Sequence, residues 1–428
     1  MRTVFMNALV HPAGVVPSPW GVMAMVVVIL LMLPHSAEPF STLPMMGAMR
    51  SSAMVIPPRL QRLYYQENGE LPDGLNDTTL DQTRNINTGT RGVLVEDSAQ
   101  GMPRIQRKHY TFQWHHKGHV FNINYRVEGP GNGPPLLLIH GFGANVGHFR
   151  HQYPALTEQA GYRVYAIDLL GFGASDKPSH VEYSIELFTE LLTDFTVAMD
   201  VEWASSSSPS MMETKERETK KKWVIAGNSI GGLCSLTVAA KLRDLVRGVV
   251  LFNCSAGMTA FRHEDLPPLL RPMIFFFRQV MLGPRVGTYF FTNFKTRQNV
   301  ESILKFQGVY RDASRVDDEL LEILLEPGND EGAETVFLKV MGGPAGPTPE
   351  SILPHLECPV FAIWGGADPW TPPDRGMHPA TQYHLHVNQE KGAFDLVVLP
   401  DVGHCPHDEA PEVVNELMIK WIQSLPPP

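Results

Sequence analysis

The sequence of 428 residues has few cysteines and no cluster of basic residues, and both absences exclude classes of protein. Its four cysteines are far apart and include no Cys-x-x-Cys pair, which argues against a disulfide framework and a zinc ribbon. We expect these thiols to be reduced and mostly buried. Acidic residues number 45 against 35 lysines and arginines, so the net charge is −10. Nucleic acid is therefore not an expected partner, because its binding needs clustered lysine and arginine.

The apolar run near the N-terminus is short for a membrane span. It covers the thirteen residues 21–33, with Arg2 upstream and Pro34 at its end. A signal peptide has an apolar region of about 7 to 15 residues, whereas a transmembrane helix needs about 20. Residues 36–66 then carry arginine, serine and methionine with a single acidic residue, which is typical of a transit peptide. We interpret residues 1–66 as a bipartite targeting segment that resembles plastid addresses. Secretion and a membrane anchor are the alternatives.

The rest of the chain alternates apolar runs with helical stretches, one of which is expected around 186–199. Residues 67–108 are polar and turn-rich and are interpreted as a linker. A short continuous apolar run such as 135–139 is typical of a strand buried on both faces of a parallel sheet. We interpret five further, mainly apolar runs as strands: 162–167, 223–226, 248–254, 359–365 and 394–399. The pattern predicts an α/β fold with a mostly parallel, doubly wound sheet. We expect the core of this fold to comprise residues 109–255 and 352–428, with a disordered insertion at 204–222. A helical cap, 256–351, is expected after the strand that ends near Cys254.

One serine lies in the segment around which the chain is organised. Residues 222–241 combine an apolar run, a turn at Ser229 and an apolar helix. A sharp strand-to-helix turn needs small neighbours two positions to either side, and Gly227 and Gly231 meet that need. This Gly-x-Ser-x-Gly pattern predicts a nucleophile elbow. The alternative is an ordinary turn in which the serine only caps the helix, and that alternative requires no partner histidine or acid.

Two later loops supply an acid and a histidine. Asp368 follows the apolar run 359–365, and His404 follows the run 394–399. Loops at the carboxyl ends of parallel strands share one crevice, so we expect both residues to converge with Ser229. The order serine, acid, histidine along the chain is typical of α/β-hydrolases. We predict a catalytic triad in which the histidine takes the serine proton and the acid orients the imidazole.

The loop after the run 135–139 reads His140-Gly-Phe-Gly. Such a loop can place the backbone N–H of Phe142 beside that of Ile230, the residue after the serine. We predict that these two N–H groups form an oxyanion hole. The glycine spacing does not match Gly-x-Gly-x-x-Gly, so no dinucleotide site and no cofactor are expected.

Three other residues compete for the same roles. Asp168 is a second candidate acid, although its place in a glycine-rich loop favours anchoring that loop by hydrogen bonds. Asn253 ends the strand at which hydrolases also keep their acid, but an amide cannot serve as one. His407 is a rival base or half of a metal pair. A single His-x-x-His followed by Asp408 lacks the ligand set of a common site, so no metal is predicted.

The predicted cap is rich in aromatic residues that are separated by arginines. Its simplest role is to cover the substrate pocket. In a second interpretation it also touches a membrane face and admits a long apolar substrate. The side chains expected to line the substrate pocket are Met273, Phe276, Phe277 and Trp370.

Three stretches resemble the pheophytinase and chlorophyll dephytylase branch of plastid α/β-hydrolases. They are the elbow, 227–232, the acid loop, 368–370, and the histidine loop with the start of the final helix, 403–415. The resemblance covers 135–422 and implies that the phytyl ester on the propionyl side chain of chlorophyll, or of its magnesium-free form, is hydrolysed by a Ser-His-Asp triad. The insertion and the cap depart from the family's pattern, and the elbow lacks the Gly-His-Ser-Arg-Gly sequence of the separate plant chlorophyllases.

Together these features predict a plastid serine ester hydrolase that works through an acyl-enzyme on an apolar, phytylated pigment. Peripheral contact with the thylakoid membrane is a further hypothesis. A plastid lipase or carboxylesterase would share every catalytic residue named above. A hydrolase-fold receptor that binds an apolar ligand without turnover is the non-enzymatic alternative. Epoxide hydrolase and dehalogenase chemistry is not expected, because those reactions need a carboxylate at the position of Ser229.

Overall fold

The computed structural model of the chain describes residues 109–206, 222–258, 284–375, 378–388, 390 and 392–427. The targeting segment, the linker and most of the predicted insertion lie outside these ranges, as do Met273, Phe276 and Phe277. Within the described ranges, no helix combines the length and the apolar character that a membrane crossing requires. All four cysteines are buried and free, as expected.

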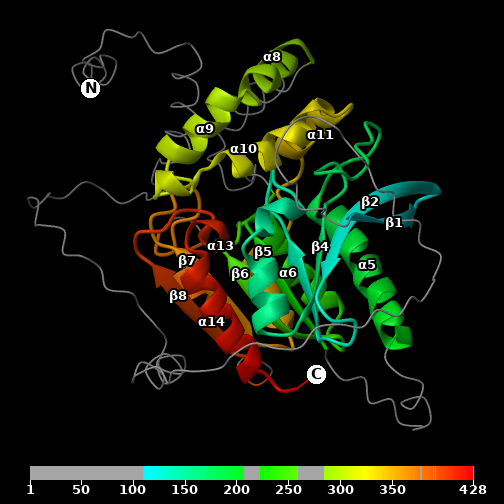
Figure 1. Cartoon of the computed structure of the whole chain (residues 1–428), viewed down its shortest axis with the longest axis vertical. Coiled ribbons are helices and arrows are strands. Elements are labelled where there is room, and N and C mark those ends of the chain that lie inside the picture. Colours follow the sequence, from blue (N-terminus) through cyan, green and yellow to red (C-terminus); the bar gives the residue numbers. More distant parts are fainter. Residues whose placement is uncertain are drawn as a thin grey trace, which may run out of the picture. The chain divides into compact units, whose positions relative to one another are not determined.

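Eight strands of the described chain form one sheet, in the order β1-β2-β4-β3-β5-β6-β7-β8 (Figure 1). The strands are β1 (His109–His116), β2 (His119–Glu128), β3 (Pro135–Ile139), β4 (Arg163–Ile167), β5 (Trp223–Asn228), β6 (Val246–Phe252), β7 (Val360–Gly365) and β8 (Phe394–Leu399). β2 pairs antiparallel with β1 and with β4, and the other neighbours are parallel. The mostly parallel sheet predicted from the apolar runs is therefore confirmed.

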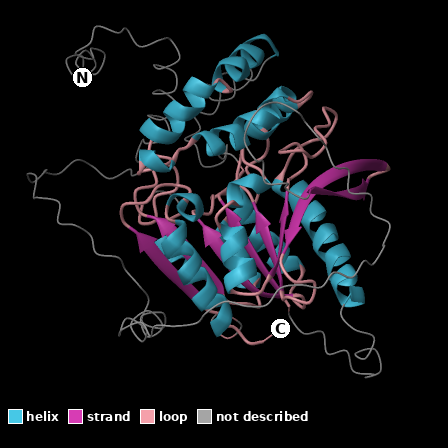
Figure 2. Ribbon diagram, in the orientation of Figure 1, coloured by secondary structure: helices cyan, strands magenta, loops and turns pink. Residues whose placement is uncertain are grey.

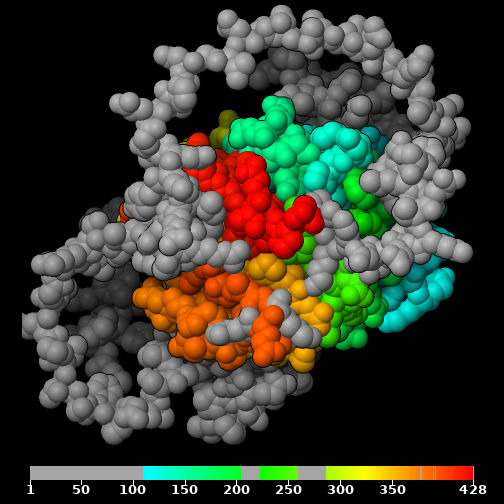
Figure 3. Space-filling model, turned by 90° about the horizontal axis from the view of Figure 1, so that it is seen from below, coloured from blue at the N-terminus to red at the C-terminus, as the bar shows by residue number. Residues whose placement is uncertain are grey.

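Helices cover both faces of the sheet (Figure 2). The helices of the core are η1 (Val146–Phe149), α4 (Gln152–Pro154), η2 (Ala155–Gln159), α5 (Ile185–Ser206), α6 (Ile230–Lys241), η7 (Ala380–Leu385), α13 (Pro406–Glu409) and α14 (Pro411–Ser424). Successive residues of a strand point to opposite faces. In β3, Leu137 and Ile139 therefore pack with α5 and α6, whereas Leu136 and Leu138 pack with η1 and α14. Figure 3, a view from below, shows α14 in red at the surface.

The helix α5 is longer than its apolar pattern predicts. The sequence indicates a helix around 186–199, yet α5 continues to Ser206 and overlaps the predicted insertion by three residues. Two tertiary hydrogen bonds anchor its last turns. The carboxylate of Asp200 accepts from Nε1 of Trp223 at 3.0 Å, and Nε1 of Trp203 donates to the carbonyl of Gly133 at 2.9 Å. Packing against the core thus extends the helix beyond its amphipathic stretch.

Between β6 and β7 the chain leaves the sheet and forms a set of helices (Figure 1). Those described are α8 (Pro284–Phe294), α9 (Arg297–Phe306), η4 (Ala313–Arg315), α10 (Asp318–Leu325), η5 (Glu326–Asn329), α11 (Ala333–Gly342), α12 (Pro349–Ile352) and η6 (Leu353–His355). Leu304 of α9 and Leu320 of α10 belong to one apolar cluster with Cys405, the residue after His404. The cap helices therefore pack against the loop that carries the predicted base.

Candidate active site

Ser229 lies in a strained turn between β5 and α6. Its φ of 55° and ψ of −120° fall outside the conformations that side chains prefer, which costs about 1–3 kcal/mol. The turn is tight: a Cβ on Gly227 would collide with the carbonyl of Gly231, and a Cβ on Gly231 would collide with that of Ile139. The hydroxyl of Ser229 makes no capping hydrogen bond to the helix. The alternative of a serine that merely caps α6 is therefore wrong.

Asp368 and His404 meet in the structure, although 36 residues separate them. Nδ1 of His404 lies 2.7 Å from Oδ2 of Asp368, and both side chains are buried. An ionised carboxylate can only accept a hydrogen bond, so the proton of the neutral imidazole is on Nδ1. The lone pair of Nε2 is then available to accept a proton. This is the arrangement that a general base requires.

Three further donors hold the carboxylate of Asp368. The side-chain amide of Asn253 donates to Oδ2 at 2.6 Å, the hydroxyl of Thr371 donates to the same oxygen, and the N–H of Trp370 donates to Oδ1 at 2.8 Å. Burial on its own would raise the pKa of Asp368. The charge and hydrogen bond of His404, together with the bonds from Thr371 and Trp370, outweigh burial and lower this pKa to about 2. The carboxylate is therefore ionised at neutral pH.

This depressed pKa predicts a pH-dependent contribution to stability. An unfolded aspartate has a pKa of about 4, so the folded carboxylate stabilises the protein above that pH and loses its contribution as pH falls toward 2. We expect the free energy of unfolding of the wild type, minus that of Asp368→Asn, to fall by roughly 2 kcal/mol between pH 5 and pH 2. Urea unfolding at several pH values measures this difference. A difference that stays constant with pH would contradict it.

A side-chain amide ties the elbow to the histidine loop. Nδ2 of Asn228, the residue before Ser229, donates to the carbonyl of His404 and to that of Phe252, each at 3.1 Å. Within the described chain, neither the hydroxyl of Ser229 nor Nε2 of His404 has a hydrogen-bond partner. Among the described residues, no hydrogen bond therefore joins these two groups, although Asn228 ties their loops together. Catalytic hydrogen bonds of this kind often tighten only when substrate binds.

The two backbone N–H groups of the predicted oxyanion hole also make no hydrogen bond in the described structure. Among the described residues, neither Phe142 nor Ile230 donates a backbone hydrogen bond. The imidazole of His140 fixes the loop: Nε2 accepts from the N–H of Leu169 at 3.0 Å, so Nδ1 donates to the carbonyl of Gly141 at 2.7 Å. That carbonyl and the N–H of Phe142 belong to one planar peptide group, so the bond from His140 also fixes the direction of the N–H.

Comparison with known proteins shows the family of the chain. The sequence pattern of the Alpha/beta hydrolase family matches residues 136–417, which is more than half of the chain. The chain belongs to the alpha/beta hydrolase family.

This alpha/beta hydrolase is similar to proteins with different activities. It is 28% identical over 355 residues to a chloroplastic pheophytinase of Arabidopsis thaliana, covering 78% of this chain and 70% of the relative. It is 24% identical over 307 residues to epoxide hydrolase 3 of Xenopus tropicalis, covering 70% and 74%. A solved structure of a thermophilic esterase from Thermogutta terrifontis matches with a TM-score of 0.53 and 20% identity, over 74% of this chain and 98% of that one. The structural likeness shows the fold alone.

Neither competing residue, Asp168 or His407, has contacts that suit the role of acid or base in the hydrolase. The carboxylate of Asp168 accepts from the amide of Asn124 at 2.7 Å and from the N–H groups of Val146 and Ala174, so it anchors its loop as predicted. His407 is buried against the ring of Phe252, and burial lowers its pKa well below the usual value. Its two ring nitrogens have no partner in the described structure. No acid orients this ring, which makes it a poor rival base.

Aromatic rings lie beside two of the predicted site residues, His404 and Phe142. The ring of Trp370 lies 5.0 Å from that of His404, between ring centres, and half of the Trp370 side chain is exposed. The ring of Phe142 lies 5.8 Å from that of Phe172 and 5.4 Å from that of Phe337, a residue of α11 in the cap. Of the four predicted pocket residues, Trp370 is the one inside the described ranges, and it lies beside the predicted base.

Sequence reasoning missed several residues that hold the site. Asn253 was considered only as a failed acid, yet its amide binds both Asp368 and the backbone of Gly365. Its φ of 42° is one that asparagine tolerates better than most residues, and that position at the end of a strand was the available signal. Asn228 stands inside the elbow motif itself. An amide beside a predicted nucleophile indicates a structural tie to a neighbouring loop.

Proposed function

We propose that the protein is a serine ester hydrolase with Ser229, His404 and Asp368 as its triad. The main observation in support of the proposal is the buried Asp368–His404 pair, whose side chains lie 2.7 Å apart. The amide of Asn228 also ties the loop of His404 to the elbow. A strained serine with a free hydroxyl, and an oriented imidazole on a loop tied to its elbow, are the groups that nucleophilic attack on an ester requires.

The proposed reaction has two half-reactions. Nε2 of His404 takes the hydroxyl proton as Ser229 Oγ attacks the ester carbonyl, and the N–H groups of Phe142 and Ile230 hold the oxyanion. The imidazolium then protonates the leaving alcohol, which leaves an acyl-enzyme. A water molecule, deprotonated by the same imidazole, releases the acid. Asp368 stays ionised throughout, which its low pKa supports, and stabilises the imidazolium.

For the substrate, we propose the phytyl ester of a chlorophyll-type pigment, either chlorophyll or pheophytin. Two features support this choice: the similarity to a protein named pheophytinase over 78% of the chain, and the aromatic rings of Trp370, Phe142 and Phe337 around the site. A long isoprenoid alcohol is almost wholly apolar, and apolar walls favour its binding. A lipase or carboxylesterase that acts on other apolar esters is the alternative within the same mechanism.

The test of the substrate compares esters in parallel. Purified protein is given pheophytin a, chlorophyll a, a triacylglycerol and a short nitrophenyl ester, and free phytol, fatty acid and nitrophenol are measured. We expect phytol release from at least one pigment with a kcat/KM above that for the triacylglycerol. Hydrolysis of the acylglycerol without phytol release would refute the pigment assignment but keep the esterase. Turnover of none of the four would favour the non-catalytic receptor.

Epoxide hydrolysis is disfavoured although a relative is named for it. That similarity is 24% identity, and the elbow of this chain carries Ser229 rather than a carboxylate. A serine hydroxyl needs a base to become a nucleophile, and the His404–Asp368 pair is built to supply one. The same site residues therefore support ester chemistry over epoxide chemistry.

We further propose that the protein works in the plastid, at the surface of the thylakoid membrane. The targeting composition of residues 1–66 supports the compartment. Two large apolar side chains support the surface contact: Phe306 is 80% exposed and Trp370 50% exposed, on segments that touch where Gly308 meets Pro369. A fluorescent protein fused to residues 1–62 that stays outside the plastid would refute the location, and failure to float with galactolipid vesicles would refute the contact.

A further inference from the structure

The loop of the predicted base is held from the cap side as well as from the core. After α9 the chain turns at Gly308, which has a φ of 78°, and Val309 then lies against the histidine loop. The N–H of His404 donates to the carbonyl of Val309 at 2.8 Å. A Cβ on Gly403 would collide with that same carbonyl. The backbone of the predicted base is thus hydrogen-bonded directly to the cap.

One buried carboxylate joins the same two segments. Oε2 of Glu409, in α13, accepts from the N–H of Gly403 at 2.7 Å, and its Oε1 accepts from the N–H of Asp312 at 2.7 Å. The side chain is 3% exposed. Burial raises the pKa of Glu409 and the hydrogen bonds from backbone N–H groups oppose that rise. Through these two hydrogen bonds, the carboxylate of Glu409 links Gly403, the residue before His404, to Asp312 of the cap.

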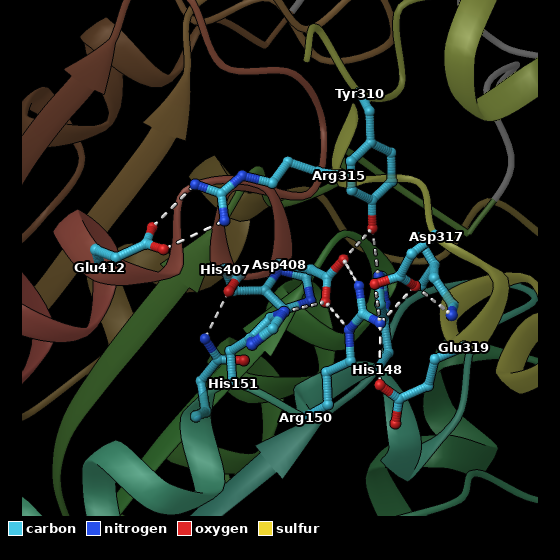
Figure 4. Close-up of polar contacts among 12 residues, drawn as sticks. His148, Arg150, His151, Tyr310, Arg315, Asp317, Glu319, His407, Asp408 and Glu412 are labelled. Atoms are coloured by element: carbon cyan, nitrogen blue, oxygen red, sulfur yellow. Dashed lines mark hydrogen bonds and ion pairs between the residues drawn. The ribbon is translucent and has the colours of Figure 1, made fainter. Parts of the chain in front are cut away.

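A second set of side chains contacts Tyr310, the cap residue that follows Val309 (Figure 4). The hydroxyl of Tyr310 donates to Oδ2 of Asp408 at 2.9 Å and lies 2.9 Å from Nε2 of His148. Because that hydroxyl has one proton, Nε2 of His148 must donate to it. Burial lowers the pKa of His148 to about 4, which keeps its ring neutral. The guanidinium of Arg150 donates to Asp408 at 2.8 Å.

Arg150 also reaches the cap directly. Its Nη1 lies 2.7 Å from the carboxylate of Asp317, whose other role is to cap α10 by accepting from the N–H of Leu320. The bonds to Asp317 and Asp408 raise the pKa of Arg150 above its usual value, although burial acts against them. The cap therefore contacts the histidine loop and its neighbours through a backbone hydrogen bond, the buried carboxylates of Glu409 and Asp408, and an ion pair between the buried Arg150 and the half-exposed Asp317.

We propose that the cap segment Val309–Asp312 positions the catalytic base, with Glu409 as the positioning residue that transmits the position to His404. The inference rests on the proposed ester hydrolysis. The cap would then have a second role besides covering the substrate pocket, because any displacement of the cap by a substrate would also displace the imidazole of His404. A displacement of about 1 Å in a reacting group can cost on the order of 100-fold in rate.

The test compares Glu409→Gln with a matched variant, Glu412→Gln. The glutamine at 409 keeps the shape but turns one acceptor into an NH₂ group that faces a backbone N–H. Glu412 joins the same two parts of the chain through Arg315, but on the exposed surface and away from Gly403. Both variants of the full chain are assayed with a phytylated pigment and with nitrophenyl acetate, which is too small to need the cap for binding.

We expect Glu409→Gln to lower kcat about 10- to 100-fold for both esters, with KM within about twofold of the wild-type value. Glu412→Gln should match the wild type. Equal kcat for Glu409→Gln and wild type overturns the inference. So does a defect confined to the pigment, or one carried by KM alone, because either places the role of the bridge in substrate binding.

A second variant covers the case in which Glu409→Gln does not fold. Tyr310→Phe removes a single hydroxyl from the same segment, and we expect a several-fold fall in kcat for both esters at unchanged KM. A kcat equal to that of the wild type overturns the inference by this route too. If the wild type itself turns over no ester, the proposed function fails and this inference with it. An active wild type beside a fully active Glu409→Gln removes the inference alone.

Discussion

Replacing Ser229 with alanine should lower kcat for ester hydrolysis on the order of 10⁵- to 10⁶-fold, the scale on which serine hydrolases respond to loss of the nucleophile. The variant lacks the atom that forms the acyl-enzyme, and the imidazole of His404 then has only water to activate. The turn keeps its backbone, because alanine and serine have the same Cβ and the neighbouring glycines are unchanged. Steady-state hydrolysis of the best substrate measures the loss.

The control is Ser424→Ala, which removes a hydroxyl at the end of α14 that donates to the carbonyl of Trp421. It should retain wild-type kcat. Thermal unfolding of both variants checks that neither loses its fold. A Ser229→Ala variant that keeps more than about a tenth of wild-type activity would mean that another group attacks the ester, and the proposed mechanism would fail.

Replacing Asp368 with asparagine should lower kcat about 10⁴-fold, with a smaller change in KM. The amide can donate a hydrogen bond to Nδ1 of His404, which favours the tautomer that carries its proton on Nε2. That nitrogen then has no lone pair for the serine proton. The amide would also face the donating side chains of Asn253 and Thr371, which now lack an acceptor. The pH profile of kcat/KM measures both the loss and the change in the titration of the base.

Asp401→Asn is the matched control, because Asp401 is an exposed carboxylate three residues before His404. It should leave kcat and the pH profile unchanged. If Asp368→Asn behaves like Asp401→Asn, the histidine does not depend on its buried carboxylate. The proposed role of Asp368 would then be lost, even if Ser229 proved essential.

The strands β3 to β7 could be predicted from the sequence because they are buried on both faces of the sheet. Leu136 and Leu137 of β3 face opposite layers of helices, so both must be apolar, and the run stands out as continuous. The end of α5 could not be read in this way. Its last turns depend on hydrogen bonds from Trp203 and Trp223 to residues distant in sequence, and a periodicity cannot reveal such bonds.

In the candidate site too, some features could be predicted from the sequence and others could not. The loops that carry Ser229, Asp368 and His404 could be placed from the sequence, because each follows an apolar run at the carboxyl end of a parallel strand and those ends lie at one edge of the sheet. The supporting residues could not. Val309 contributes only its backbone carbonyl to the loop of the base, and any residue carries one. Glu409 looks like an ordinary acidic residue in the first turn of a helix until the cap is seen against it.

The claim on which the account depends is that Ser229 is the activated nucleophile. The most direct measurement is the mass of the tryptic peptide 223–241 after the protein reacts with a fluorophosphonate, with fragmentation to locate the adduct. We expect a single adduct on Ser229 in the wild type, and none in His404→Ala after the same reaction time. An adduct on Ser235 of the same peptide, or an unlabelled peptide from folded wild-type protein, would contradict it.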